Sequence, residues 1–271
     1  MNHGKKQSYT ILGDNMLYEN NIFSFYYKKY GNSPKTIIIL PGWGYTRETF
    51  QEIIQKLQKE YTIYIVDYPY FGNSPLPNKE LTIYDYAETF FNFITELEII
   101  NPIIIAHSFG GRITSLLIGK YNLKVDKIVL IDVAGIKRRK KLNVYLKEKI
   151  YKLLKRLIRI LPKKRQLLIQ KKLLQKFASE DYMNLPIIMK KSFQNIIKEN
   201  LKKYYKKITS ETLIIWGEKD IDTPLKDAKL LNKIIKNSGL IIFKNTTHYS
   251  YLYNKNLTIK ILNSFLNNKS N

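Results

Sequence analysis

The stretch Ile103-Ile104-Ile105-Ala106-His107-Ser108-Phe109-Gly110-Gly111-Arg112 decides the fold. An apolar, β-branched run meets a serine between small residues, and apolar residues then recur at helical spacing as far as Lys120. This pattern predicts a buried strand, a sharp turn with Ser108 at its tip, and a helix. The helix N-terminus would place free backbone N–H groups and a positive dipole end beside the serine. The alternative is an ordinary strand–helix turn that happens to contain serine.

The same alternation of strand and helix extends on both sides of this stretch. Apolar strands are predicted at residues 36–40, 61–66, 127–132, 212–217 and 240–243, after two short strands at 8–12 and 22–30. Amphipathic helices are predicted at residues 48–59, 81–99, 225–235 and 256–266. Such alternation indicates the α/β class: right-handed crossovers, a mostly parallel sheet, and helices on both faces.

Residues 134–207 interrupt the alternation with a helical, basic segment. We interpret it as an inserted helical cap, which leaves residues 1–133 and 208–271 as the core domain. Between residues 137 and 176 seventeen Lys or Arg residues stand against the single acid Glu148. A solvated face, an acidic partner protein, or an anionic membrane surface would each account for this charge. We do not expect nucleic acid as a partner, since no recognisable binding module accompanies the charge.

Composition points to a globular protein of a reducing compartment. The 271 residues are 44% hydrophobic, contain no cysteine and carry a formal net charge of +24. Disulfides and thiol chemistry are therefore excluded. The first ten residues lack the apolar core of a signal peptide, and no apolar run approaches the roughly 18 residues of a membrane span. We therefore expect a soluble, cytoplasmic protein.

A reactive serine needs a base, and the base needs an orienting carboxylate. Of the three histidines, His3 lies in a polar tail, and His107 adjoins Ser108 on an extended backbone where successive side chains point in opposite directions. This leaves His248, after the last strand, as the candidate base. Asp220 follows a strand and is the candidate acid.

Two other carboxylates remain possible acids. Asp222 lies two residues beyond Asp220, and Asp132 follows the preceding strand. Each of the three is also of a type that often serves as a turn or helix-capping residue.

The negative oxygen formed during acyl transfer needs two N–H donors. The backbone of Phe109, directly after the serine, is the first candidate. Trp43, in the glycine-flanked stretch Gly42-Trp43-Gly44, is the second, because glycines allow close approach of the backbone.

With these residues placed, the chain resembles the α/β-hydrolase superfamily over nearly all of its length outside residues 134–207. The family's His-Gly-x-x motif corresponds to residues 41–44, its Asp-x-x-Gly-x-Gly-x-Ser loop to 67–74, its Gly-x-Ser-x-Gly-Gly elbow to 106–111, and its Trp-Gly-x-x-Asp motif to 216–220. Pro41, Tyr70 and Ala106 depart from the pattern. A serine nucleophile argues against the dehalogenase and epoxide-hydrolase branches.

The resemblance implies a serine hydrolase without metal or cofactor, most simply a carboxylesterase that acts on an apolar acyl ester through an acyl-enzyme. Gly42, Trp43, Tyr70 and Phe109 would contact the substrate. A carbon–carbon bond hydrolase, an acyl transferase or a lyase would use the same residues. A non-catalytic binding protein of this fold is the alternative from another class. The basic segment also resembles that of esterases which cleave methyl esters on an acyl carrier protein, an acidic partner.

Overall fold

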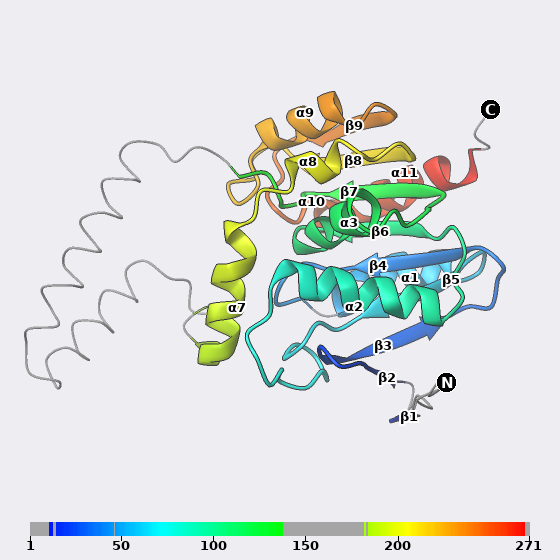
Figure 1. Cartoon of the computed structure of the whole chain (residues 1–271). Helices are drawn as coiled ribbons and strands as arrows, with labels where there is room; N and C mark the ends of the chain where they lie inside the picture. The colour runs from blue at the N-terminus through cyan, green and yellow to red at the C-terminus, as the bar shows by residue number, and fades with distance from the viewer. Residues whose placement is uncertain (1–10, 13–14, 46, 138–181, 183, 269–271) are drawn as a thin grey trace, which may run out of the picture.

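The computed structural model describes residues 11–12, 15–45, 47–137, 182 and 184–268 (Figure 1). Within them, nine strands form one sheet in the order β1-β2-β3-β5-β4-β6-β7-β8-β9. Neighbours from β5 to β9 run parallel, whereas β1, β2 and β3 pair antiparallel at one edge. The strand bounds are β1 Ile11–Leu12, β2 Asn15–Glu19, β3 Ser24–Tyr30, β4 Thr36–Leu40, β5 Thr62–Val66, β6 Ile103–His107, β7 Lys127–Ile131, β8 Glu211–Gly217 and β9 Ser238–Phe243.

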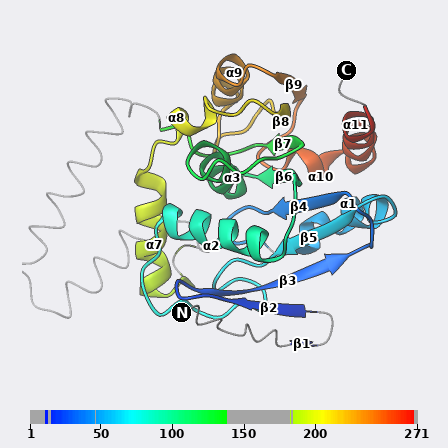
Figure 2. The same cartoon turned by 45° about the vertical axis from the view of Figure 1, so that its right-hand side comes forward.

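Helices cover both faces of this sheet (Figures 1 and 2). On one face lie α2 (Ile83–Glu96), α3 (Phe109–Gly119), α8 (Lys202–Tyr205) and α9 (Leu225–Ile234). On the other lie η1 (Arg47–Phe50), α1 (Gln51–Leu57), α10 (Ser250–Tyr253) and α11 (Lys255–Asn267). The predicted α/β class and mostly parallel sheet are therefore confirmed.

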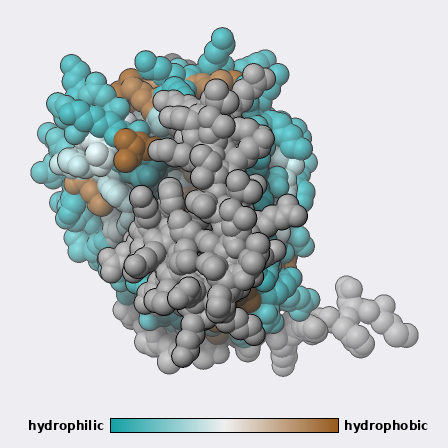
Figure 3. All heavy atoms as spheres, turned by 90° about the vertical axis from the view of Figure 1, so that its left-hand side faces the viewer, coloured by the Kyte–Doolittle hydropathy of each residue, from teal (hydrophilic) through white to brown (hydrophobic). Residues whose placement is uncertain are grey.

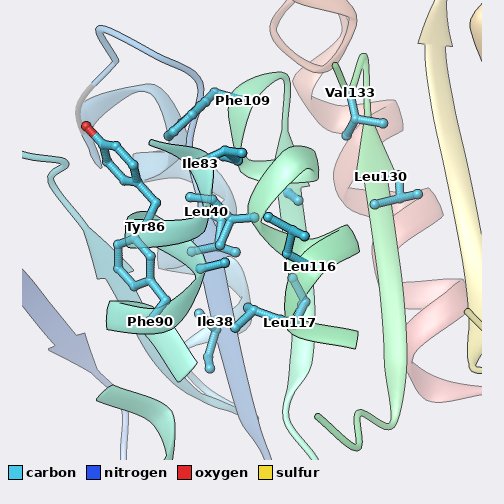
Figure 4. Close-up of a cluster of buried hydrophobic side chains, with 14 of the residues drawn as sticks. Ile38, Leu40, Ile83, Tyr86, Phe90, Phe109, Leu116, Leu117, Leu130 and Val133 are labelled. Carbon is cyan, nitrogen blue, oxygen red and sulfur yellow. The ribbon is translucent and has the colours of Figure 1, made fainter. Parts of the chain in front are cut away.

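The central strands divide their side chains between two hydrophobic cores. Ile38 and Leu40 of β4 enter the core beneath α2 and α3, whereas Ile37 and Ile39 enter the core beneath α1 and α11. Neighbouring strands alternate in the same way because successive side chains of a strand point to opposite faces. Figure 4 shows part of the first core, in which side chains from α2, α3, β4 and β7 meet. A sheet covered on both faces has no solvated side, which is why its central strands are almost entirely apolar.

The N-terminal edge of the sheet differs from the prediction. The sequence predicts two short strands, at residues 8–12 and 22–30, but a further strand, β2, runs between them and pairs with β3, Met16 opposite Tyr27. The strand escaped prediction because it lies near the sheet edge and buries Tyr18 alone of its five residues. The helix expected over residues 48–59 begins instead as the 3₁₀ turn η1 and ends at Leu57.

Most of the predicted cap, residues 138–181, lies outside the described residues. The described remainder includes α7 (Ile187–Lys198), which contacts the start of α2: Ser192 Oγ accepts a hydrogen bond from Leu81 N at 2.9 Å. On the face of the molecule where α7 lies, the coloured surface is mostly hydrophilic (Figure 3). No helix among the described residues is long and apolar enough to cross a membrane.

Gly110, at the start of α3, provides a test of this packing. An added Cβ there would lie 2.0 Å from the backbone oxygen of Leu40, whereas one on Gly239 would meet nothing within 4 Å. We expect Gly110→Ala to lower the free energy of unfolding by about 1–3 kcal/mol through overpacking. Gly239→Ala should stay within about 0.5 kcal/mol of wild type. Urea denaturation measures both, and equal stabilities of the two variants would contradict the close approach of α3 to β4.

Candidate active site

The carboxyl ends of the parallel strands meet at one edge of the sheet, and the chain order reverses at β4, between β5 and β6. Such a reversal leaves a crevice beyond the strand ends, where sites form in open α/β sheets. Loops from successive strands bring the predicted residues to this edge. They are the β4 loop (residues 41–45), Ser108 after β6, Asp132 after β7, the β8 loop (218–224) with Asp220, and the β9 loop (244–249) with His248.

Ser108 occupies a strained backbone conformation, with φ of 47° and ψ of −107°. A non-glycine residue in such a region costs about 1–3 kcal/mol, so its surroundings must hold it there. Ser108 N donates to Ile131 O at 3.0 Å, and Ser108 O accepts from Ala134 N at 2.9 Å. This strained turn places Ser108 between the end of β6 and the start of α3. It is the sharp turn with serine at its tip that the sequence predicts.

Ser108, His248 and Asp220 form a continuous chain of hydrogen bonds. The Ser108 Oγ lies 2.8 Å from His248 Nε2, and His248 Nδ1 lies 2.8 Å from Asp220 Oδ2. A carboxylate only accepts, so Nδ1 carries the proton of the neutral ring and Nε2 presents a lone pair to the serine hydroxyl. The side chains come from positions 112 and 28 residues apart along the sequence, and only the common sheet edge brings them together.

Asp220 is held as a carboxylate by its own loop. Its Oδ1 accepts from the backbone N–H groups of Asp222 and Thr223 at 2.8 and 2.9 Å, and its Oδ2 accepts from Thr223 Oγ1 at 2.6 Å. Burial raises the pKa of Asp220, but its hydrogen bonds with His248 and Thr223 outweigh burial and lower it below the usual value. Thr223 was not among the predicted residues, although an aspartate three residues before a Thr-Pro pair is typical of such a turn.

His248 is buried, with 8% of its surface exposed. Burial lowers the pKa of His248, but the hydrogen bond and negative charge of Asp220 outweigh this effect and raise the pKa above 6.5. The ring is thereby made a stronger base than a free imidazole.

The two alternative acids differ from Asp220 in their surroundings. Asp132 is fully buried and accepts from Gly217 N at 2.8 Å and from Ser250 Oγ and N at 2.6 and 3.1 Å. Burial raises the pKa of Asp132 to about 7, against the opposing effect of these hydrogen bonds. Asp132 thus ties the end of β8 to the start of α10. The side chain of Asp222 is exposed.

The β4 loop turns tightly through Trp43. Tyr45 N donates to Gly42 O at 3.2 Å, and Gly44 has φ of 82°, the conformation that the third position of a type II turn requires. The Trp43 ring packs edge-on against Phe109 at 5.2 Å between centroids and against Phe71 at 5.3 Å. The two predicted amide donors therefore belong to residues that contact each other, and the Phe109 N–H, first in its helix, has no acceptor within that helix.

Aromatic side chains surround this contact. Phe193 of α7 packs on Trp43 at 5.4 Å, so the segment between β7 and β8 contributes to the site. Tyr70, predicted to contact substrate, is 37% exposed and packs edge-on against Phe71. Its φ of 75° is one that favours glycine, the residue that the α/β-hydrolase pattern has at this position. The contact of Tyr70 with substrate stays a prediction.

His107 does not point toward the hydroxyl of Ser108. Its buried ring reaches the β9 loop, where Nε2 lies 2.9 Å from the backbone oxygen of His248. Strand periodicity excluded His107 as the base but predicted no contact for its ring. Alternation along a strand gives the direction of a side chain and not the residues that surround it.

Three side chains at the site could together hold a cation. Asp220, Asp222 and His248 offer ligand atoms that lie within 4.8 Å of one another. Asp220 and His248 are already bonded to each other, so this cluster is accounted for by the hydrogen-bond chain.

A mostly parallel α/β sheet with a Ser–His–Asp hydrogen-bond chain at its carboxyl edge defines the class of the α/β hydrolases. Comparison with known families agrees: residues 35–255 match the alpha/beta hydrolase fold family, and the chain belongs to that family.

Individual relatives are distant but nearly full-length. An uncharacterized hydrolase of Bacillus subtilis, YugF, is 25% identical over 82% of this chain and 87% of its own. A pimeloyl-[acyl-carrier protein] methyl ester esterase of Wigglesworthia glossinidia brevipalpis is 24% identical over 89% of this chain and 97% of its own. The solved structure of a bromoperoxidase from Bacillus anthracis superposes with a TM-score of 0.72 at 17% identity, covering 94% of this chain and all of that one. The last likeness is one of fold.

The pairing of His248 with Asp220 predicts a measurable pKa change. Asp220→Asn removes the negative charge and should lower the pKa of His248, followed by NMR titration of the ring. Asp222→Asn is the matched control: its charge also raises the pKa, but it ranks below Asp220 and Asp132 in effect, so its shift should be smaller. An unchanged His248 pKa in Asp220→Asn would show that this carboxylate does not govern the ring.

Proposed function

We propose that this protein is a serine carboxylesterase that cleaves esters of apolar acyl groups through an acyl-enzyme intermediate. The observation that carries the proposal is the unbroken hydrogen-bond chain from Ser108 Oγ through His248 to Asp220, each link 2.8 Å long. A serine hydroxyl alone is a weak nucleophile, and this arrangement is what activates it.

In the first half of the proposed reaction, Ser108 Oγ attacks the ester carbonyl carbon while its proton passes to His248 Nε2. The carbonyl oxygen becomes negative and accepts hydrogen bonds from the backbone N–H groups of Phe109 and Trp43. When the carbon–oxygen bond to the leaving group breaks, His248 gives that proton to the departing alkoxide. An alcohol leaves, and the acyl group remains on Ser108.

Water completes the cycle. His248 takes a proton from the water as its oxygen attacks the acyl carbon, and the proton returns to Ser108 Oγ when the intermediate collapses. The carboxylic acid is released. Asp220 stays ionised throughout, because its loop hydrogen bonds stabilise the carboxylate, and it stabilises each transient His248 imidazolium.

The preference for an apolar acyl group rests on the aromatic residues around the site. The Trp43 ring contacts three uncharged aromatic rings, those of Phe71, Phe193 and Phe109, the residue directly after Ser108. Apolar surface of the substrate buried against such rings leaves water at a gain of roughly 25 cal/mol per Å². The methyl ester esterase among the relatives is consistent with such a substrate, and its acyl-carrier protein gives one interpretation of the basic segment of residues 137–176.

Other reactions of the same residues are separated by their products. A carbon–carbon bond hydrolase would release a carbon acid instead of an alcohol, and a transferase would pass the acyl group to an added alcohol in preference to water. A non-catalytic binding protein would leave Ser108 unreactive toward a fluorophosphonate. Product analysis and labelling of the same preparation therefore decide among the alternatives.

Ser108→Ala and His248→Ala should each lower kcat for an aryl ester by about 10⁴–10⁶. Ser115→Ala is the control: it removes another serine hydroxyl of the same helix, one that donates to Arg112 O at 2.8 Å, and should leave turnover unchanged. A fluorophosphonate should modify the Ser108 peptide only when His248 is present. Turnover retained in either of the first two variants would remove the assignment.

A panel of aryl esters with lengthening straight acyl chains tests the substrate class. Each added methylene buried against the aromatic rings is worth about 0.8 kcal/mol, which corresponds to roughly a fourfold gain in kcat/KM. We expect kcat/KM to rise along the series until the chain extends beyond the aromatic rings. A series that falls from the acetyl ester onward would contradict the apolar acyl preference.

A further inference from the structure

His107 lies between three parts of the site that the sequence keeps far apart. Its backbone directly precedes Ser108 at the end of β6. One edge of its ring bonds to the β9 loop, where Nε2 lies 2.9 Å from His248 O. The other edge faces the β4 loop: a Cβ added to Gly42 would stand 2.9 Å from His107 Nδ1. The His107 ring thus lies against both the β9 loop, which carries His248, and the β4 loop, which carries Trp43. The backbone of His107 is joined directly to that of Ser108.

The contacts define which ring nitrogen carries the proton. A backbone carbonyl only accepts, so the bond to His248 O requires a hydrogen on Nε2. Nδ1 is buried and has no hydrogen-bond partner among the described residues. Burial, followed by the nearby His248, lowers the pKa of His107 to about 3. The ring is therefore neutral and remains a one-proton donor while His248, 5.1 Å away between ring centroids, gains and loses its own proton.

The surrounding aromatic rings leave the imidazole little freedom to turn. Tyr249 and Tyr251 lie 5.7 and 5.1 Å from it between centroids, and Tyr45 of the β4 loop lies 6.3 Å away, edge-on. The Tyr45 and Tyr249 hydroxyls also bond to each other, which joins the β4 and β9 loops a second time. The His107 ring lies within ring-contact distance of both of these tyrosines.

We propose that His107 is a positioning residue, whose Nε2–H holds the β9 loop so that His248 stays within hydrogen-bond distance of Ser108. The inference rests on the proposed function for its catalytic consequence. The β9 loop is tied elsewhere to the β8 loop, through Lys219 N to Thr246 O at 2.8 Å, and to Asp132 through Ser250. The His107 bond is the tie that runs to the strand bearing the nucleophile. Without the His107 bond, the distance between Ser108 and His248 would depend on contacts that run through β7 and β8.

Three substitutions separate the hydrogen bond from simple packing. In His107→Gln the side-chain amide nitrogen reaches the place of Nε2 and donates without charge. In His107→Asn the shorter amide reaches only the place of Nδ1, so the bond to His248 O is lost while polarity is kept. His107→Leu keeps comparable bulk and removes the donor. Ile104→Ala, on the same strand and buried in the core beneath α2 and α3, is the control for lost stability.

We expect His107→Gln to retain most of the wild-type kcat. His107→Asn and His107→Leu should lower kcat, by up to about 100-fold, with KM unchanged, because a misplacement of about 1 Å between reacting groups costs that much. The rate of fluorophosphonate labelling of Ser108 should fall in parallel. Ile104→Ala should lower Tm and leave kcat and the labelling rate of the folded protein unchanged. A purely structural role for His107 would reproduce the Ile104→Ala pattern.

Two results would overturn the proposal. One is wild-type kcat and labelling rate in both His107→Asn and His107→Leu. The other is a loss of kcat in His107→Gln as large as in His107→Leu, since the donor would then be irrelevant.

Failure of the proposed function is recognised separately, by a wild-type protein that hydrolyses no ester in the panel. The downfield NMR resonance of the proton between His248 and Asp220, measured without substrate, then reports the loop position. It should persist in wild type and His107→Gln and broaden in His107→Asn, and its persistence in all three would also refute the positioning role.

Discussion

The strained backbone at Ser108 is the constraint on which the rest of the site depends. A serine at φ of 47° is stable only where its neighbours hold it, and here both of its own backbone groups bond to the chain around β7. The next turn of chain must also pass very close to β4, where Gly110 N donates to Pro41 O at 3.0 Å. Ser108 is thus anchored to the two neighbouring strand ends, and the stability of the sheet supports the local strain.

Around Ser108, ionisable groups of the same type have different pKa values because their surroundings differ. Asp220 and Asp132 both lie at strand ends, but loop hydrogen bonds and His248 lower the pKa of Asp220, whereas burial raises that of Asp132 to about 7. The two imidazoles differ in the same manner. Burial keeps His107 neutral, and Asp220 raises the pKa of His248 above 6.5. In the proposed reaction, such divergence lets one residue of each pair carry the chemistry.

Much of the fold could be predicted because burial on two faces leaves a direct mark on the chain. Strands such as β6 and β7 are apolar at every position that the cores need, and the alternation with amphipathic helices implies parallel pairing. The meeting of Ser108, Asp220 and His248 could be predicted for a related reason. Each of them follows an apolar strand, and parallel strands end at one edge of the sheet. The strand β2 could not be predicted, because a strand this near the sheet edge buries too little to show a pattern.

The sequence by itself determined which residues could reach the carboxyl edge of the sheet, because strand periodicity and chain direction are local properties. It did not determine which carboxylate pairs with His248. Asp132, Asp220 and Asp222 all qualify by position, and Asp220 is selected by distances across three loops. Nor did it reveal the contact between His107 and the β9 loop, 141 residues away. Those choices belong to the tertiary structure, since hydrogen bonds depend on separations of a few tenths of an ångström that no local pattern encodes.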